Sequence, residues 1–104
     1  MTITIDPTRA AAVLLPQLTT HVQAHLDAAA QAAGYDTIYT AVSYAEEPSV
    51  PKFQAEGHAF RAWRSLVWAA ANAIRADVEA GTRPVPTAAQ LIAELPTLTL
   101  PTPE

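Results

Sequence analysis

The longest continuous hydrophobic pattern of the chain lies between residues 53 and 81. Apolar side chains recur there at steps of three, four or seven residues, which places them on one side of an α-helix. The row consists of Phe53, Phe60, Trp63, Val67, Ala70, Ile74 and Val78. We therefore predict one long helix over about residues 52–80, which Gly81 ends.

This long helix is apolar on more than one side, because Leu66 and Trp68 lie away from the main row. A helix of this kind has to be covered by other helices of its own chain or by a partner. Gly57 lies inside the helix, where glycine costs about 1 kcal/mol relative to alanine. We expect this glycine either to admit another backbone at close range or to mark a bend.

A second helix is predicted over about residues 16–33, with Gly34 as its stop. Its inward row consists of Leu15, Leu18, Val22, Leu26, Ala29 and Ala33. Asp6 and Pro7 also resemble a helix start. Proline inside a helix removes a backbone hydrogen bond, so Pro16 either kinks a longer helix or opens a new one. We favour the start at Pro16, with at most a turn or two before it.

Two short helices complete the pattern. The first covers about residues 37–45 behind Asp36 as a capping residue, and its β-branched side chains leave a strand as the alternative. The second covers about residues 87–95, where Thr87 is the expected cap. Their buried candidates are Ile38, Val42 and Ala45 in the first, and Leu91, Ile92 and Leu95 in the second.

These elements predict an all-α fold of three or four helices in a single small domain over residues 1–104. In its helical core, residues 16–96, the two longer helices pack antiparallel and the short ones close the ends. Residues 1–15 are expected to be an extended, partner-binding segment, and residues 97–104 an extended tail. Half of the residues are hydrophobic, but many of them are alanine, which contributes little core volume, so we expect a homo- or hetero-oligomer.

Composition excludes several classes of function. The formal net charge of −4 argues against binding to nucleic acid, which favours clustered Lys and Arg. The absence of cysteine excludes disulfides, thiolate metal sites and cysteine nucleophiles. No apolar run approaches the roughly 20 residues of a membrane-spanning helix, and the start MTITIDPTR does not resemble a signal peptide. We expect a protein made in the cytoplasm, without membrane insertion.

Catalytic chemistry is not indicated by any motif. His21 and His25 are one helical turn apart, a spacing that two metal ligands can have, but no third ligand is indicated. A small metal- or acid-responsive enzyme or sensor built on these histidines is the remaining alternative. The adjacent Glu46 and Glu47 do not suit paired catalytic carboxylates, which must face each other across a substrate. We predict no catalytic residues, no metal and no cofactor.

Partner contacts are expected from apolar residues near the termini and from one basic–aromatic group. Arg61, Trp63 and Arg64 form that group, since Trp and Arg are enriched at binding hot spots. The bulky aromatic residues otherwise suit the core, so Trp63 is either a core residue or an anchor. The predicted partner-binding residues are Ile3, Ile5, Leu14, Leu15, Leu18, Val22, Arg61, Trp63, Leu98 and Leu100.

Residues 34–96 carry several short motifs in a distinctive order. These are GYD, a Tyr-Ala pair, FQAEG, AWR, VW, AG-R-P-PT and ELP. In this order the sequence resembles a group of small tailed-bacteriophage proteins associated with tail fibres.

The resemblance implies a non-enzymatic structural component of the tail, which attaches to or bridges the tail fibre and the baseplate. The implied location is the virion, after synthesis in the host cytoplasm. The alternative is a tail-fibre assembly chaperone that is absent from the mature virion. The resemblance assigns no catalytic residues.

Overall fold

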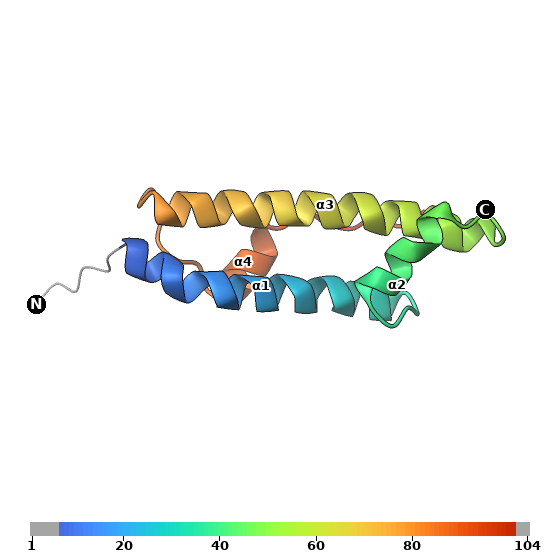
Figure 1. Ribbon diagram of the computed structural model, residues 1–104, viewed down its shortest axis with the longest axis horizontal. Coiled ribbons are helices and arrows are strands. Elements are labelled where there is room, and N and C mark those ends of the chain that lie inside the picture. Colours follow the sequence, from blue (N-terminus) through green and yellow to red (C-terminus); the bar gives the residue numbers. More distant parts are fainter. Residues whose placement is uncertain (1–6, 102–104) are drawn as a thin grey trace, which may run out of the picture.

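The fold is a helical hairpin, described here from a computed structural model. The structure describes the backbone of residues 7–101 and the side chains of residues 17–101. The α-helices are α1 (Pro7–Ala32), α2 (Ile38–Ser43), α3 (Pro51–Glu79) and α4 (Ala88–Glu94), and η1 (Tyr44–Glu46) is a 3₁₀ helix. The helices α1 and α3 lie side by side and run in opposite directions (Figure 1). The all-α prediction is confirmed, and the described residues contain no strand.

Helix α1 is longer than predicted, because it begins at Pro7 and runs through Pro16. The preferred start at Pro16 and the extended segment over 1–15 are therefore wrong for residues 7–15. The residues before Pro16 are mainly alanine and leucine, which favour helix strongly and compensate for the one hydrogen bond that a proline removes. Residues 1–6 lie outside the described part of the chain.

The end of α1 is the glycine stop that the sequence predicts. Gly34 has a φ of 97°, a backbone conformation that glycine adopts without steric cost. The amide of Tyr35 donates to the carbonyl of Ala30 at 2.9 Å, which satisfies one of the last carbonyls of the helix. The chain therefore reverses at once and brings Tyr35 over the start of α3.

Helices α2 and η1 occupy the turn between the two long helices. The N-cap of α2 is Thr37, whose hydroxyl accepts from the amide of Thr40 at 3.2 Å, so the expected cap by Asp36 is wrong. Asp27 of α1 accepts from the amide of Ile38 at 3.0 Å and supplies a second cap from outside the turn. These two bonds satisfy the first amides of a short helix, and the strand alternative is wrong.

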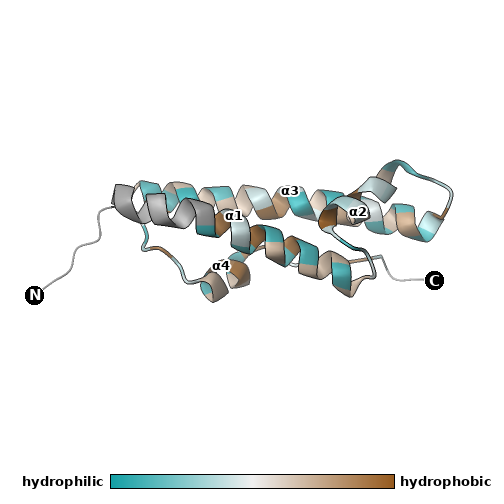
Figure 2. Cartoon of the chain, turned by 60° about the horizontal axis from the view of Figure 1, so that its bottom comes forward, coloured by the Kyte–Doolittle hydropathy of each residue, from teal (hydrophilic) through white to brown (hydrophobic). Residues whose placement is uncertain are grey.

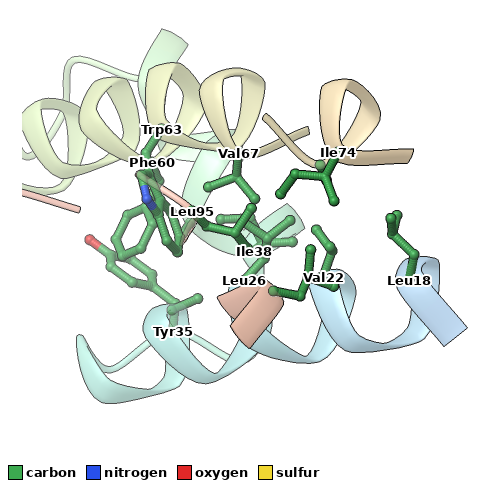
Figure 3. Close-up of a cluster of buried hydrophobic side chains, with 14 of the residues drawn as sticks. Leu18, Val22, Leu26, Tyr35, Ile38, Phe60, Trp63, Val67, Ile74 and Leu95 are labelled. Atoms are coloured by element: carbon green, nitrogen blue, oxygen red, sulfur yellow. The ribbon is translucent and has the colours of Figure 1, made fainter. Parts of the chain in front are cut away.

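Helix α3 has the predicted length and ends as predicted, with Gly81 at a φ of 76° just after it. The inward face differs slightly from the predicted row, because Ala71 rather than Ala70 is buried and Phe53 is partly exposed. The buried side of α3 faces α1. Hydrophobic and polar residues alternate around α3 (Figure 2). Core side chains from both helices meet between them, among them Val22, Leu26, Phe60 and Val67 (Figure 3).

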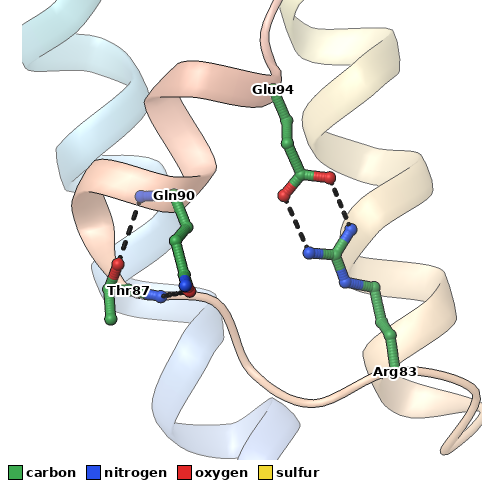
Figure 4. A network of polar contacts seen from close by, with 4 residues as sticks. All are labelled: Arg83, Thr87, Gln90 and Glu94. Carbon is green, nitrogen blue, oxygen red and sulfur yellow. Dashed lines mark hydrogen bonds and ion pairs between the residues drawn. The ribbon is translucent and has the colours of Figure 1, made fainter.

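Helix α4 begins with a capping box. The Thr87 hydroxyl accepts from the amide of Gln90 at 3.1 Å, and the Gln90 side chain accepts from the amide of Thr87 at 2.9 Å (Figure 4). Leu91 and Leu95 of this segment are buried, as predicted. The helix does not close an end of the hairpin; it lies beside the middle of α1 and α3 (Figure 1). The molecule is elongated, with extents of 62 × 20 × 19 Å.

Candidate partner-binding surface

Several residues predicted to bind a partner belong instead to the core. Leu18 and Val22 are buried between α1 and α3, so the prediction that they contact a partner is wrong for this fold. Their helical spacing was recognised, but spacing alone does not show whether the covering helix belongs to the same chain. Leu14 and Leu15 lie in α1, and their side chains are outside the described residues, as are Ile3 and Ile5 altogether.

Trp63 is a core residue. Only 5% of its surface is exposed, and its ring meets the His25 ring edge-on at a centroid distance of 5.5 Å. Its Nε1 donates to the carbonyl oxygen of Pro96 at 2.8 Å, so the polar atom of the indole is satisfied within the chain. The anchor interpretation of Trp63 is therefore wrong, and the core interpretation is confirmed.

Residues 97–101, the part of the C-terminal tail that the structure describes, pack against their own chain. Leu98 and Leu100 are partly buried on the hydrophobic core, whereas Thr97 and Thr99, which alternate with them, are exposed. This alternation is that of an extended segment with one face on the core. The bond between Trp63 and Pro96 fixes where the segment begins. Leu98 and Leu100 were predicted to bind a partner, but their side chains pack on the core of their own chain.

Arg61 is exposed, as a partner-binding residue has to be. Its guanidinium forms an ion pair with Glu46 of η1, and its Nη2 donates to Nδ1 of His58 at 3.2 Å. These contacts hold the arginine against the surface of α3. Surface ion pairs of this kind add little to stability, so Arg61 remains accessible for exchange with the charges of a partner.

One side of α3 gathers the residue types that dominate binding hot spots. Arg61, Arg64, Trp68 and Arg75 follow one another at steps of three, four and seven residues, so they share one side of the helix. The guanidinium of Arg64 lies 5.5 Å from the ring centroid of Tyr39, which is 72% exposed. We call Tyr39 and these four residues the arginine face.

Arg61 is exposed and Arg64 is partly exposed, but the sequence analysis combined them with Trp63, which is the wrong aromatic residue. Trp63 points into the core, and Trp68 is half-buried beside the arginines. The signal for Trp68 was present, because it lies one helical turn after Arg64. Tyr39 could not be placed there from sequence, since its position depends on how α2 packs on α3.

The opposite flank of α3 carries almost only alanine. Leu66 lies at its centre and is 58% exposed. The spacing alternates between four and three residues, which is the repeat of a helix-packing seam. This alanine face consists of Ala55, Ala59, Ala62, Leu66, Ala69, Ala73 and Ala76. It is a smooth surface, and it contrasts with the long side chains of the arginine face.

The motifs behind the resemblance lie mostly in contacts that hold the fold together. Tyr35 of GYD donates its hydroxyl to Oε1 of Glu56 in FQAEG at 2.7 Å. Gly57 of the same motif lies against the backbone of Tyr44 and Ala45, so the prediction of a close backbone approach is confirmed. Trp63 of AWR donates to Pro96 of ELP.

The remaining motif pair forms a two-pronged ion pair. Both Nη atoms of Arg83 lie within 2.9 Å of the Glu94 carboxylate oxygens (Figure 4). The hydrogen bond from Arg83 lowers the pKa of Glu94, and the same bond raises the pKa of Arg83. This pair links the connector after α3 to the end of α4, and it therefore has a structural role.

Other titratable groups do not converge on a reactive centre. Within the described residues, no cluster of three or more His, Asp and Glu side chains could hold a metal ion, and His25 lies against Trp63. Glu47 accepts from the hydroxyl and amide of Ser49, and these hydrogen bonds lower its pKa. None of the described helices combines the length and apolarity that a membrane crossing requires. No family model, curated protein or solved structure matches this chain.

Proposed function

We propose that the protein is a non-enzymatic structural component of a bacteriophage tail, where it attaches to or bridges the tail fibre and the baseplate. The observation that carries the proposal is the order of the seven short motifs between residues 34 and 96. Contacts join several of these motifs within this chain, and we take this as support for the proposal. The molecule is also elongated and has a long helical surface, which suits a bridging role.

The arginine face is the surface that we assign to the partner. Arg, Trp and Tyr are the residue types that most often carry binding energy at protein interfaces. The Tyr39 ring already lies against the Arg64 guanidinium, so less side-chain freedom is lost on binding. The arginine face has one net positive charge. Two of its arginines form ion pairs, Arg61 with Glu46 and Arg75 with Glu79, and Arg64 adds a third positive charge. A partner surface with carboxylates and a shallow apolar depression would complement it.

The first test is whether the chain is part of the particle. Mass spectrometry of purified virions of the bacteriophage that encodes this chain should detect it in a constant ratio to the baseplate proteins. Its absence from virions would contradict the structural role. The fibre gene would then be expressed with and without this chain, and a gain in soluble trimeric fibre would assign the chaperone function instead.

The second test locates the contact. A variant with Tyr39→Ser and Arg64→Ser should keep its helical circular dichroism and lose co-purification with the fibre or baseplate protein. Leu66→Ser on the alanine face is the matched control, because it also removes an exposed large side chain from the same region of α3. Loss of binding in the control alone would move the contact to the alanine face.

A further inference from the structure

A pocket of about 220 Å³ lies where the turn after α1 meets the first turns of α3. Three aromatic rings line it, from Tyr35, Tyr44 and Phe53. The centroid of the Tyr44 ring is 5.5 Å from that of Tyr35 and 5.4 Å from that of Phe53, and the Tyr35 and Phe53 centroids are 6.3 Å apart. The three rings thus belong to one cluster, with interplanar angles between 50° and 78°.

Charged groups complete the lining. Glu56 is only 8% exposed and accepts the Tyr35 hydrogen bond at its Oε1. Asp36 also lines the pocket, and Lys52 is the one cationic side chain among the lining residues. The lining therefore offers two carboxylates against one ammonium group. This excess of negative charge favours a cationic ligand.

Lys52 shows how a cation is accommodated here. Its Nζ lies 5.8 Å from the centroid of the Phe53 ring and 3.9 Å from Oε1 of Glu56. Aromatic faces attract ammonium groups through the ring quadrupole, and a carboxylate adds the opposite charge. The Lys52 side chain is 62% exposed, so it reaches the site from the rim and can leave it.

We propose that this aromatic pocket binds an alkylammonium group, which displaces the Lys52 ammonium from Phe53 and Glu56. The ligand chemistry is a cationic nitrogen on an alkyl stem, either a lysine side chain of a partner protein or a free quaternary amine. Tyr35, Tyr44 and Phe53 supply the aromatic surface, and Glu56 supplies the charge. None of the residues that line this pocket belongs to the arginine face. The pocket can therefore bind its ligand whether or not the protein is a component of a phage tail.

The geometry separates this site from an ordinary core cluster. A hydrophobic core excludes charge, whereas here a carboxylate with little exposure stands beside three rings and next to an open volume. Phe53 retains 36% of its exposure at the rim, although apolar burial would favour covering it. In a ligand with an apolar stem and a cationic head, the stem would cover the exposed part of Phe53 while the head contacts the Glu56 carboxylate.

The test is a titration of the full chain followed by amide and aromatic NMR shifts. Choline is compared with 3,3-dimethylbutan-1-ol, which has the same shape without the charge. Choline should give saturable shifts at Gly34, Tyr35 and Phe53, and the neutral alcohol should not. Equal shifts with both compounds, or none with any cation, would overturn the proposal. Nα-acetyl-lysine methylamide forms the second arm, and the tighter of the two cations identifies the source.

Variants at the rim sharpen the test. Lys52→Met removes the internal competitor and should raise the affinity for choline at least about fivefold, since a unit charge at this range is worth about 1 kcal/mol even in water. Lys52→Arg keeps the charge and is the matched control without a gain. Glu56→Gln keeps an acceptor for the Tyr35 hydroxyl but loses the negative charge. Phe53→Leu loses the aromatic ring. Each of these two variants should weaken the binding of choline about tenfold or more. An unchanged affinity in Lys52→Met would contradict the displacement.

Discussion

Two segments are attached to the helical hairpin of α1 and α3 by different physical means. The segment α2–η1 lies so close that the backbone of Ala45 reaches Gly57, and a buried hydrogen bond between Tyr35 and Glu56 joins the turn to the helix. Helix α4 and the tail are held by apolar side chains, one bond from Trp63 and an exposed ion pair. The first attachment depends on close fit and a buried charge, the second on apolar area and surface charge. Substitutions and pH should therefore affect them differently.

The largest effect is expected where apolar area dominates. Trp63→Ala removes a buried ring and its bond to Pro96, and should lower the free energy of unfolding by about 3–5 kcal/mol. This is a large part of the stability of a small domain. Urea denaturation followed by circular dichroism measures it, and Trp68→Ala, which removes a half-buried ring, is the control with a smaller loss. A loss below about 1 kcal/mol for Trp63→Ala would contradict the core assignment.

The next effect belongs to the buried polar contact. Tyr35→Phe removes only the hydroxyl that donates to Glu56, and should lower the free energy of unfolding by about 1.5–3 kcal/mol, as expected for a hydrogen bond to a charged group. Tyr39→Phe is the matched control, because the Tyr39 side chain is exposed and should change stability little. An equal loss in the free energy of unfolding for Tyr35→Phe and Tyr39→Phe would mean that the buried hydrogen bond to Glu56 does not contribute to stability.

The same contact predicts an alkaline response. Burial and the Glu56 carboxylate raise the pKa of Tyr35 from 10.0 to about 12. Below pH 10 the contribution of the neutral hydroxyl to stability is complete. Between pH 10 and 12 the unfolded chain releases this proton while the folded chain keeps it, so stability falls as pH rises. Denaturation at pH 9 and 11 should show a steeper loss for the natural chain than for Tyr35→Phe.

Close fit can be tested at the same segment. A Cβ at residue 57 would stand 2.5 Å from the amide nitrogen of Ala45, and backbone cannot rotate out of the way. Gly57→Ala should cost about 2 kcal/mol, because overpacking outweighs the gain of about 1 kcal/mol in helix propensity. Gly34→Ala is the comparison variant. The added Cβ would contact no other atom, but alanine would have to adopt the unfavourable positive φ of Gly34. Its loss of stability therefore measures backbone strain without overpacking. A stabilised Gly57→Ala variant would contradict the close approach.

The sequence predicted the parts of the fold that local rules control. Gly34 and Gly81 end helices and Thr87 caps one, because each acts on its immediate neighbours. The predicted start of α1 at Pro16 was wrong, since the helix propensity of the surrounding residues outweighs the cost of a proline inside the helix. The cap at Thr37 instead of Asp36 is a choice between adjacent capping residues that local spacing does not decide.

The candidate surface was less predictable for a related reason. Helical periodicity separates the two sides of a helix but does not reveal which one the own chain covers, so Leu18 and Val22 were assigned to a partner and proved to be core. Arg61 and Arg64 were found from their place beside Trp63 in the sequence, whereas Arg75 was missed. Tyr39 reaches Arg64 only through the packing of α2. The pairing of Tyr35 with Glu56 joins residues that are 21 positions apart, and no local rule indicates it.

A smaller and more local effect is expected at α4. Thr87→Ala leaves the amide of Gln90 without its side-chain acceptor and should cost about 1 kcal/mol. Because the loss concerns the first turn of a short helix, amide hydrogen exchange should accelerate in α4 before it changes in α2. Thr97→Ala, an exposed threonine of the tail, is the control without this effect. Uniform acceleration across all helices would mean that α4 is not a separately weakened segment.

The smallest effect should come from the ion pair of Arg83 and Glu94, since both groups are on the surface. The hydrogen bond from Arg83 keeps the folded pKa of Glu94 below its ordinary 4.5, so the pair stabilises the fold above that pH and its contribution disappears as pH falls through the lowered value. Thermal melts of the natural chain and Glu94→Gln should therefore differ slightly at pH 7, and the difference should disappear in acid, once the pH is below the lowered pKa of Glu94. Added salt should narrow the difference at pH 7. The two segments would then respond at opposite ends of the pH scale, with the attachment of α4 sensitive to acid and the Tyr35 contact sensitive to alkali.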